Sequence, residues 1–167
     1  SGIHAVPISE YVIGAMIAFG KGFPRALRSQ AEGRWNPYLP EELEGKTVGI
    51  LGIGAIGSRV ADIAHALGMR VLAVRRSVSA RQKGAGPVAE FLPPSELPYL
   101  LGESDYVVVA VPLTDESRRM IGEAELRSMK PTAVLVNVAR GAVIDETALT
   151  RALKEGKVAG AALDVFE

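Results

Sequence analysis

The chain has 167 residues, of which 48% are hydrophobic, so it is long enough to form one domain with a substantial core. Its 19 basic and 19 acidic residues give a formal net charge of zero, which excludes a general attraction to nucleic acid or to membrane surfaces. The absence of cysteine excludes disulfides, thiolate catalysis and cysteine–metal sites, and we expect no metal site and a cytoplasmic location.

The N-terminal segment predicts an apolar helix and then a linker. The helix is expected over Ile8–Ala18, with Ser9 as a candidate N-cap. Its apolar residues cover nearly the whole circumference, so we expect it to be buried against another domain or a partner subunit. The apolar run Tyr11–Phe19 is too short to span a bilayer. Gly33–Glu44, which contains two prolines, is predicted to be a linker.

From Thr47 onward, strand-like and helix-like segments alternate. The predicted strands are Thr47–Leu51, Arg70–Val74, Val88–Phe91, Tyr106–Val111, Ala133–Asn137 and Gly160–Leu163. The predicted helices are Ala55–Leu67, Ser95–Leu101, Glu123–Met129 and Glu146–Glu155, and Ser77–Pro87 is expected to be a loop or short helix. Uninterrupted apolar strands are typical of sheets covered on both faces, so the alternation predicts a doubly wound parallel sheet with helices on both faces. Ligands of such sheets bind beyond the C-terminal ends of the strands.

The first predicted strand runs directly into a Gly-x-Gly-x-x-Gly turn. Gly52 lets the chain turn out of the strand, Gly54 lets a pyrophosphate approach the backbone, and Gly57 lets the next helix pack closely on the sheet. The first turn of that helix, with Ala55 and Ile56, offers free N–H groups to phosphate. A strand before the motif and a helix after it make this a strong prediction of dinucleotide binding.

Four segments resemble the nucleotide-binding domain of the D-isomer-specific 2-hydroxyacid dehydrogenases, a family that includes glyoxylate/hydroxypyruvate reductases. The segments are Leu51–Gly57, Val111–Thr114, Met129–Pro131 with Val136–Gly141, and Ala159–Phe166. They occur in the family's order and, with the leading helix, cover nearly the whole chain. The resemblance implies a Rossmann-type NAD(P)-binding domain over residues 45–167. Residues 1–44 would be the interdomain helix and linker to a catalytic domain absent from this chain.

The resemblance also implies a reaction. In this family a hydride passes between the nicotinamide and the carbonyl carbon of a 2-keto acid, an arginine binds the substrate carboxylate, and a histidine oriented by a glutamate exchanges the proton. The arginine matches Arg140, whose planar guanidinium could bind a carboxylate through two hydrogen bonds; the alternative is a surface arginine in an ion pair. His4, His65 and Glu167 do not match the family's positions, so we expect this chain to bind cofactor without turning over substrate.

The end of the second predicted strand indicates which cofactor is bound. NAD-specific members of the family have an acidic residue there, which accepts hydrogen bonds from the adenosine ribose. This chain has Arg75 at that position, followed by Arg76 and Ser77. Arginines would pair with a 2′-phosphate and a serine could add a hydroxyl, so we favour NADP, with NAD as the alternative. The alternative is that these are two solvated arginines at a strand end without a role in cofactor binding, which would give the same sequence pattern.

Other cofactor contacts follow from the family positions. Val111 and Pro112 would flank the adenosine, although a purely structural use of Pro112 is an alternative. Ser117 takes the place of a cofactor-contacting threonine, Val138 and Ala139 would offer backbone groups near the nicotinamide ribose together with Arg140, and Asp164 would face the nicotinamide carboxamide. Asp145 is instead predicted to be a helix N-cap.

Two functions remain open from the sequence. The first is a reductase of 2-keto acids such as glyoxylate or hydroxypyruvate, and the second is a non-catalytic dinucleotide sensor, as in corepressor-like relatives. A small-molecule substrate is expected in the first case, with no nucleic-acid or membrane partner. The family's habit of dimerising through the nucleotide domain predicts a homodimer that involves the Ile8–Phe19 stretch.

Overall fold

Two helices precede the sheet in the computed structural model, which describes residues 4–167. Helix α1 (Ala5–Gly20) is longer than expected, and α2 (Phe23–Ala31) was not predicted. The expected cap at Ser9 is wrong, because Ser9 lies inside α1 and its hydroxyl donates to the carbonyl oxygen of Val6 at 2.8 Å. The predicted linker has no helix or strand. Residues 1–3 of the expected interdomain segment lie outside the described residues.

The sheet and its connections follow the predicted alternation. The strands are β1 (Thr47–Leu51), β2 (Arg70–Val74), β3 (Gln82–Lys83), β4 (Glu90–Leu92), β5 (Tyr106–Val109), β6 (Val134–Asn137) and β7 (Gly160–Leu163). The connecting helices are α3 (Ala55–Ala66), α4 (Leu97–Glu103), α5 (Glu123–Ser128) and α6 (Glu146–Lys154), with short 3₁₀ turns at Pro94–Glu96 and Gly141–Val143. All six predicted strands are present with small shifts at their ends, and β3 is an addition within the predicted loop.

The strand order is β3-β4-β2-β1-β5-β6-β7, and every pair except the antiparallel β3–β4 pair is parallel. Without β3, this is the order of a doubly wound dinucleotide-binding sheet, which confirms the predicted fold class. The register aligns the strand ends, since Leu51 lies beside both Val74 and Val109, and Asn137 lies beside both Val109 and Leu163. The connections after five strands therefore leave from the same edge of the sheet.

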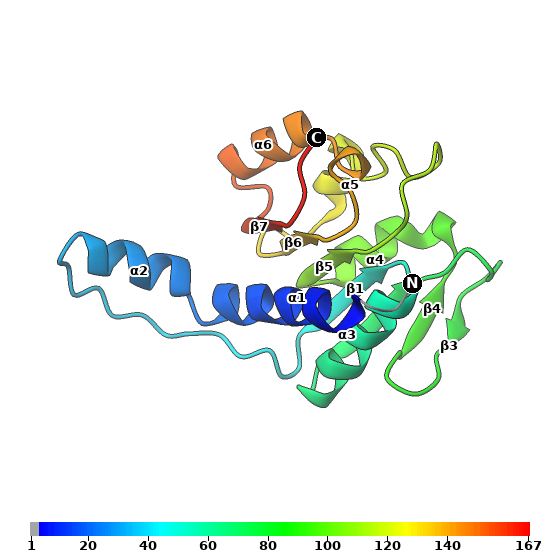
Figure 1. Ribbon diagram of the computed structural model, residues 1–167, viewed down its shortest axis with the longest axis horizontal. Helices are drawn as coiled ribbons and strands as arrows, with labels where there is room; N and C mark the ends of the chain where they lie inside the picture. Colours follow the sequence, from blue (N-terminus) through cyan, green and yellow to red (C-terminus); the bar gives the residue numbers. More distant parts are fainter. Residues whose placement is uncertain (1–3) are drawn as a thin grey trace.

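Alternate residues of each central strand enter two different cores. Val48 and Ile50 of β1 pack with α1 and α3, whereas Leu51 packs with α4, α5 and α6 on the other face. The same alternation places Val108 in the first core and Val107 in the second. The helices lie on both sides of the sheet in Figure 1. This two-sided burial explains why the central strands are continuous apolar runs.

Helix α2 and the segment after it project from the body of the protein (Figure 1). Four large apolar side chains of this helix and the segment after it are exposed to solvent: Phe23 (50%), Leu27 (63%), Trp35 (93%) and Leu39 (94%). Helix α1, in contrast, buries Val12, Ile13 and Met16 against α3 and the sheet. The chain itself thus covers one side of α1, whereas Val6 and Tyr11 on the same helix remain 46% and 37% exposed. Only part of the burial that was expected from another domain or a partner is provided within the chain. None of the helices in residues 4–167 has the length and apolar character required to cross a membrane.

The burial of Tyr106, at the start of β5, makes the free energy of unfolding depend on pH. Tyr106 is 5% exposed, and burial, reinforced by the charges of Glu41 and Asp105, raises its pKa from 10.0 to about 12. Because the folded pKa is the higher one, the stability contributed by the neutral hydroxyl is complete below pH 10 and is lost as the pH rises through about 12. We expect Tyr106→Phe to remove this part of the alkaline destabilisation. Urea unfolding of both proteins across this range measures it, and parallel pH profiles would contradict it.

Candidate functional site

The turn after β1 has the conformation that its three glycines allow. Gly52 has a φ of +95°, and a Cβ there would lie 2.8 Å from the carbonyl oxygen of Ala110. A Cβ at Gly57 would overlap the carbonyl oxygen of Gly52, so α3 packs directly onto the turn. A Cβ at Gly54 would meet nothing within 4 Å, so the space in front of this backbone is open. The turn therefore offers the approach to the backbone that a pyrophosphate requires, and it fits the predicted cofactor.

Helix α3 begins at this turn and contributes free donors. Its first residues, Ala55, Ile56 and Gly57, have no intrahelical acceptor for their N–H groups, because the first intrahelical donor lies a full turn later. The positive end of the helix dipole points in the same direction. The predicted phosphate-binding residues are thus arranged as an anion-binding helix start.

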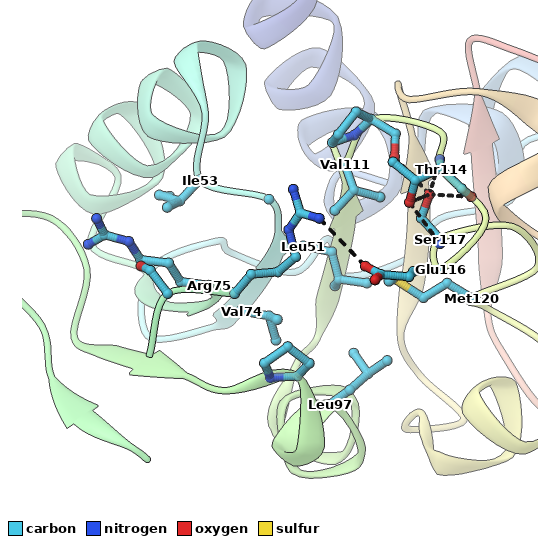
Figure 2. A pocket seen from close by; sticks show the side chains of 15 residues that line it. Leu51, Ile53, Val74, Arg75, Leu97, Val111, Thr114, Glu116, Ser117 and Met120 are labelled. Atoms are coloured by element: carbon cyan, nitrogen blue, oxygen red, sulfur yellow. Dashed lines mark hydrogen bonds and ion pairs between the residues drawn. The ribbon is translucent and has the colours of Figure 1, made fainter. Parts of the chain in front are cut away.

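A pocket of about 490 Å³ lies beside the turn, at the C-terminal edge of β1, β2 and β5. We call it the edge pocket, and Figure 2 shows its lining side chains. Seven of the predicted site residues line it: Gly52, Arg75, Arg76, Ser77, Val111, Pro112 and Ser117. Apolar side chains, among them Leu97 and Met120, complete its wall. The parallel register explains this gathering, since the three strands end side by side.

Two arginines with different neighbours follow β2. The Cζ atom of Arg75 lies 5.6 Å from the ring centroid of Phe91, and its backbone N–H donates to the carbonyl oxygen of Leu92 at 2.9 Å. Nη1 of Arg76 lies 3.6 Å from Oε2 of Glu116 in the segment after β5. The dashed line at Glu116 in Figure 2 marks this ion pair. Sequence reasoning missed Glu116, because only the fold brings it to the end of β2.

Ser117 has a structural task in the segment after β5. Its hydroxyl donates to the carbonyl oxygen of Pro112 at 2.7 Å and accepts a hydrogen bond from the backbone N–H of Thr114 at 2.8 Å. The residue is 4% exposed although it lines the edge pocket. Ser117 therefore fixes the shape of the pocket wall, and its predicted contact with the cofactor stays a prediction.

At the end of β6, Asn137 organises the backbone that carries Arg140. Its side-chain oxygen accepts from the N–H of Ala139 at 3.0 Å, and its amide donates to the carbonyl oxygen of Arg140 at 3.1 Å. The guanidinium of Arg140 is exposed and donates to the carbonyl oxygen of Ala139 at 2.7 Å. It takes part in no ion pair within residues 4–167, which argues against the surface-ion-pair alternative. The sequence does not predict a role for Asn137, and the structure shows that its side chain orders the backbone of the loop that carries Arg140.

The segment after β7 lies close to the Arg140 loop. The N–H of Asp164 donates to the carbonyl oxygen of Asn137 at 3.0 Å, and a Cβ at Gly141 would overlap the backbone of Phe166. The Asp164 carboxylate is exposed. Burial of the Tyr11 hydroxyl on α1 raises the pKa of Tyr11, and the negative charge of Asp164 is the second cause of this increase. The structure thus brings the predicted residues Val138, Ala139, Arg140 and Asp164 together beyond β6 and β7, outside the edge pocket.

Neither histidine belongs to this edge. His65 is in the last turn of α3 and lines a separate hollow with Gly68 and Arg70, at the opposite end of the sheet. His4 precedes α1 and is exposed. Asp145 accepts from the N–H of Ala148 at 2.9 Å, so it is the N-cap of α6 as predicted.

Comparisons with known proteins agree with this geometry. Residues 13–167 match the family model described as D-isomer specific 2-hydroxyacid dehydrogenase, NAD binding domain. A glyoxylate reductase from Thermococcus gammatolerans is 53% identical over 135 residues, which are 80% of this chain and 39% of that protein. The chain therefore spans about two fifths of the length of that curated relative.

Solved structures give the same result. A D-isomer specific 2-hydroxyacid dehydrogenase from Xanthobacter autotrophicus, in complex with NADPH and MES, superposes with a TM-score of 0.87 at 35% identity, over 95% of this chain and 49% of that one. A phosphoglycerate dehydrogenase from Lactobacillus plantarum gives a TM-score of 0.90 at 33% identity, over 99% of this chain and 53% of that one. With a family model that matches most of its length, this chain belongs to the D-isomer specific 2-hydroxyacid dehydrogenases, and it corresponds to their NAD-binding domain.

Proposed function

We propose that this chain is the cofactor-binding domain of an NAD(P)-dependent oxidoreductase acting on a small 2-keto or 2-hydroxy acid, glyoxylate being the first candidate. The observation that carries the proposal is the shared edge of the sheet, where the glycine turn and Arg140 lie at the ends of β1 and β6. The name of the relative from Thermococcus gammatolerans supports glyoxylate as the substrate. The bound nicotinamide would supply or accept the hydride.

Different residues along this edge of the sheet would bind different parts of the cofactor and the substrate. The turn at Gly52–Gly57 and the start of α3 would hold the pyrophosphate. Val138 and Ala139 would offer backbone groups to the nicotinamide ribose, and Asp164 would accept from the carboxamide. Arg140 would bind the substrate carboxylate through two charge-assisted hydrogen bonds and would draw electron density from the neighbouring carbonyl.

We expect Arg140→Gln to lower kcat/KM for glyoxylate by about 10- to 100-fold, because the variant loses a charge-assisted contact worth about 1.5–3 kcal/mol. The cofactor affinity should stay the same. The assay is NADPH oxidation with glyoxylate, in the longest natural form of the protein that contains these 167 residues. Arg118→Gln, on the exposed segment after β5, is the matched control. Binding of NADPH without turnover in the unmutated protein would favour the dinucleotide sensor instead.

We further propose that NADP is preferred over NAD. No carboxylate follows β2; Arg75, Arg76 and Ser77 line the edge pocket there, and two guanidinium groups favour a phosphate over a hydroxyl. The NADPH bound to the relative from Xanthobacter autotrophicus supports the same preference.

Fluorescence titration of the full chain with NADPH and NADH at equal ionic strength tests this preference. We expect the tighter binding for NADPH. Arg75→Asp should shift the preference toward NADH by about 1–3 kcal/mol, the size of a charge-assisted contact, because the variant places a carboxylate where a 2′-phosphate would bind. Lys157→Asp, which makes the same charge change away from the edge pocket, is the control. Tighter binding of NADH by the unmutated chain would contradict the proposal.

A homodimer is the third proposal, with a second copy of the chain covering the projecting arm formed by α2 and residues 33–39. The arm is ordered by its own contacts, since the hydroxyl of Tyr38 donates to the carbonyl oxygen of Lys21 at 2.8 Å and Arg25 lies 4.8 Å from the Tyr38 ring centroid. Its exposed apolar side chains form an unpartnered surface, and a net charge of zero does not oppose self-association. The arm is a better candidate than the predicted Ile8–Phe19 stretch, whose apolar face α3 and the sheet partly cover.

We expect light scattering at micromolar concentration to give the mass of two chains, and Trp35→Ser combined with Leu39→Ser to give the mass of one. Both side chains are more than nine-tenths exposed, at 93% and 94%, so their replacement leaves the core intact. A monomer at this concentration for the unmutated chain, or a dimer that survives the double substitution, would contradict the proposal.

A further inference from the structure

The two arginines of the edge pocket have neighbours of different kinds, an aromatic ring for the first and a carboxylate for the second. Arg75 lies over the face of Phe91, at 5.6 Å from the ring centroid, and takes part in no ion pair within residues 4–167. An aromatic face attracts a guanidinium without using its N–H groups, so these donors stay available for a ligand. Arg75 is thus oriented without being neutralised.

Arg76 is partly neutralised by Glu116. The two side chains come from opposite walls of the edge pocket, after β2 and after β5, with β1 between these strands in the sheet. Their ion pair, 3.6 Å between Nη1 and Oε2, crosses the pocket (Figure 2). The side chains are 72% and 80% exposed, so solvent screens the pair and neither burial nor packing holds it closed.

The position of this carboxylate has different consequences for the two cofactors. A phosphate that pairs with Arg76 must displace Glu116 and then stays near its negative charge. A ribose hydroxyl can instead donate a hydrogen bond to the same carboxylate. A carboxylate in this position would act against the phosphorylated cofactor, in the way that an acidic residue at the end of β2 would, but from the other side of the pocket.

We propose that Glu116 is a specificity-determining residue, which weakens the binding of NADP(H) by competing with its 2′-phosphate for Arg76. The inference rests on the proposed function only in placing the adenosine ribose of a dinucleotide in the edge pocket. Arg75, which lies over Phe91, would then supply the pairing that does not depend on displacing a carboxylate.

The test compares four proteins: the unmutated chain, Glu116→Gln, Glu116→Lys and Asp115→Asn. Asp115 is the matched control, because it adjoins Glu116 and is exposed, yet does not line the edge pocket. The dissociation constants of NADPH and NADH are measured by fluorescence titration at low and high salt, and circular dichroism and urea unfolding verify that each variant folds.

We expect Glu116→Gln to bind NADPH about three- to tenfold more tightly, with NADH binding unchanged or slightly weaker, since competing exposed pairs and nearby like charges have effects of this order. High salt should reduce the gain, and Glu116→Lys should enlarge it. For Asp115→Asn, the change in NADPH binding should stay below about twofold.

Equal tightening of NADPH and NADH by Glu116→Gln, or a gain no larger than that of Asp115→Asn, would overturn the role of Glu116 while leaving the NADP preference intact. Preference of the unmutated chain for NADH would overturn the cofactor proposal, whereas a selective NADPH gain in Glu116→Gln would still support the role of Glu116. Binding of neither dinucleotide would overturn both.

Discussion

The contact between Gly57 and the carbonyl oxygen of Gly52 fixes how closely α3 lies against β1. No side chain fits between them, so the helix begins as soon as the strand ends and its first N–H groups open toward the C-terminal edge of the sheet. The parallel register brings the ends of β2, β5, β6 and β7 to that same edge. Every residue proposed to contact the cofactor or the substrate lies within a short connection of this turn or of one of those strand ends.

Burial on both faces explains how much of the fold could be predicted. The run Val107–Val109 is fully buried, and its residues alternate between two cores, so both sides must be apolar and the strand is evident from composition alone. Helix α2 was not predicted, although Phe23, Ala26 and Leu27 follow helical spacing on one side of it. That side packs on neither core of this chain, because Phe23 is 50% and Leu27 63% exposed. Pro24 in the first turn of α2 is a second signal of a helix. The short strand β3 exists only through its pairing with β4, which no local pattern reveals.

In the candidate site too, the residues that could be predicted differ from those that could not in whether their role is encoded locally. The glycine turn, the arginines after β2 and the Arg140 segment could be identified because each is encoded by consecutive residues. Glu116 and Phe91 could not, since each acquires its neighbour through the sheet: one faces Arg76 across β1, and the other lies beneath Arg75 from β4. Asn137 and Ser117 are intermediate cases. Both stand in recognisable segments, but only the three-dimensional structure shows that their polar groups bind the backbone of their own loops.

The exposure of Arg75, Arg76 and Glu116 also affects how easily these residues can be substituted during evolution. All three lie beyond the strand ends and outside both cores, where substitutions change the free energy of unfolding by about 0.5 kcal/mol or less. The side chains that we propose to distinguish one dinucleotide from the other are therefore nearly free of the constraints that fix the fold. Mutation can exchange them at little risk to folding, so a lineage could change its supply of reducing equivalents while the glycine turn, held between β1 and α3, stays as it is.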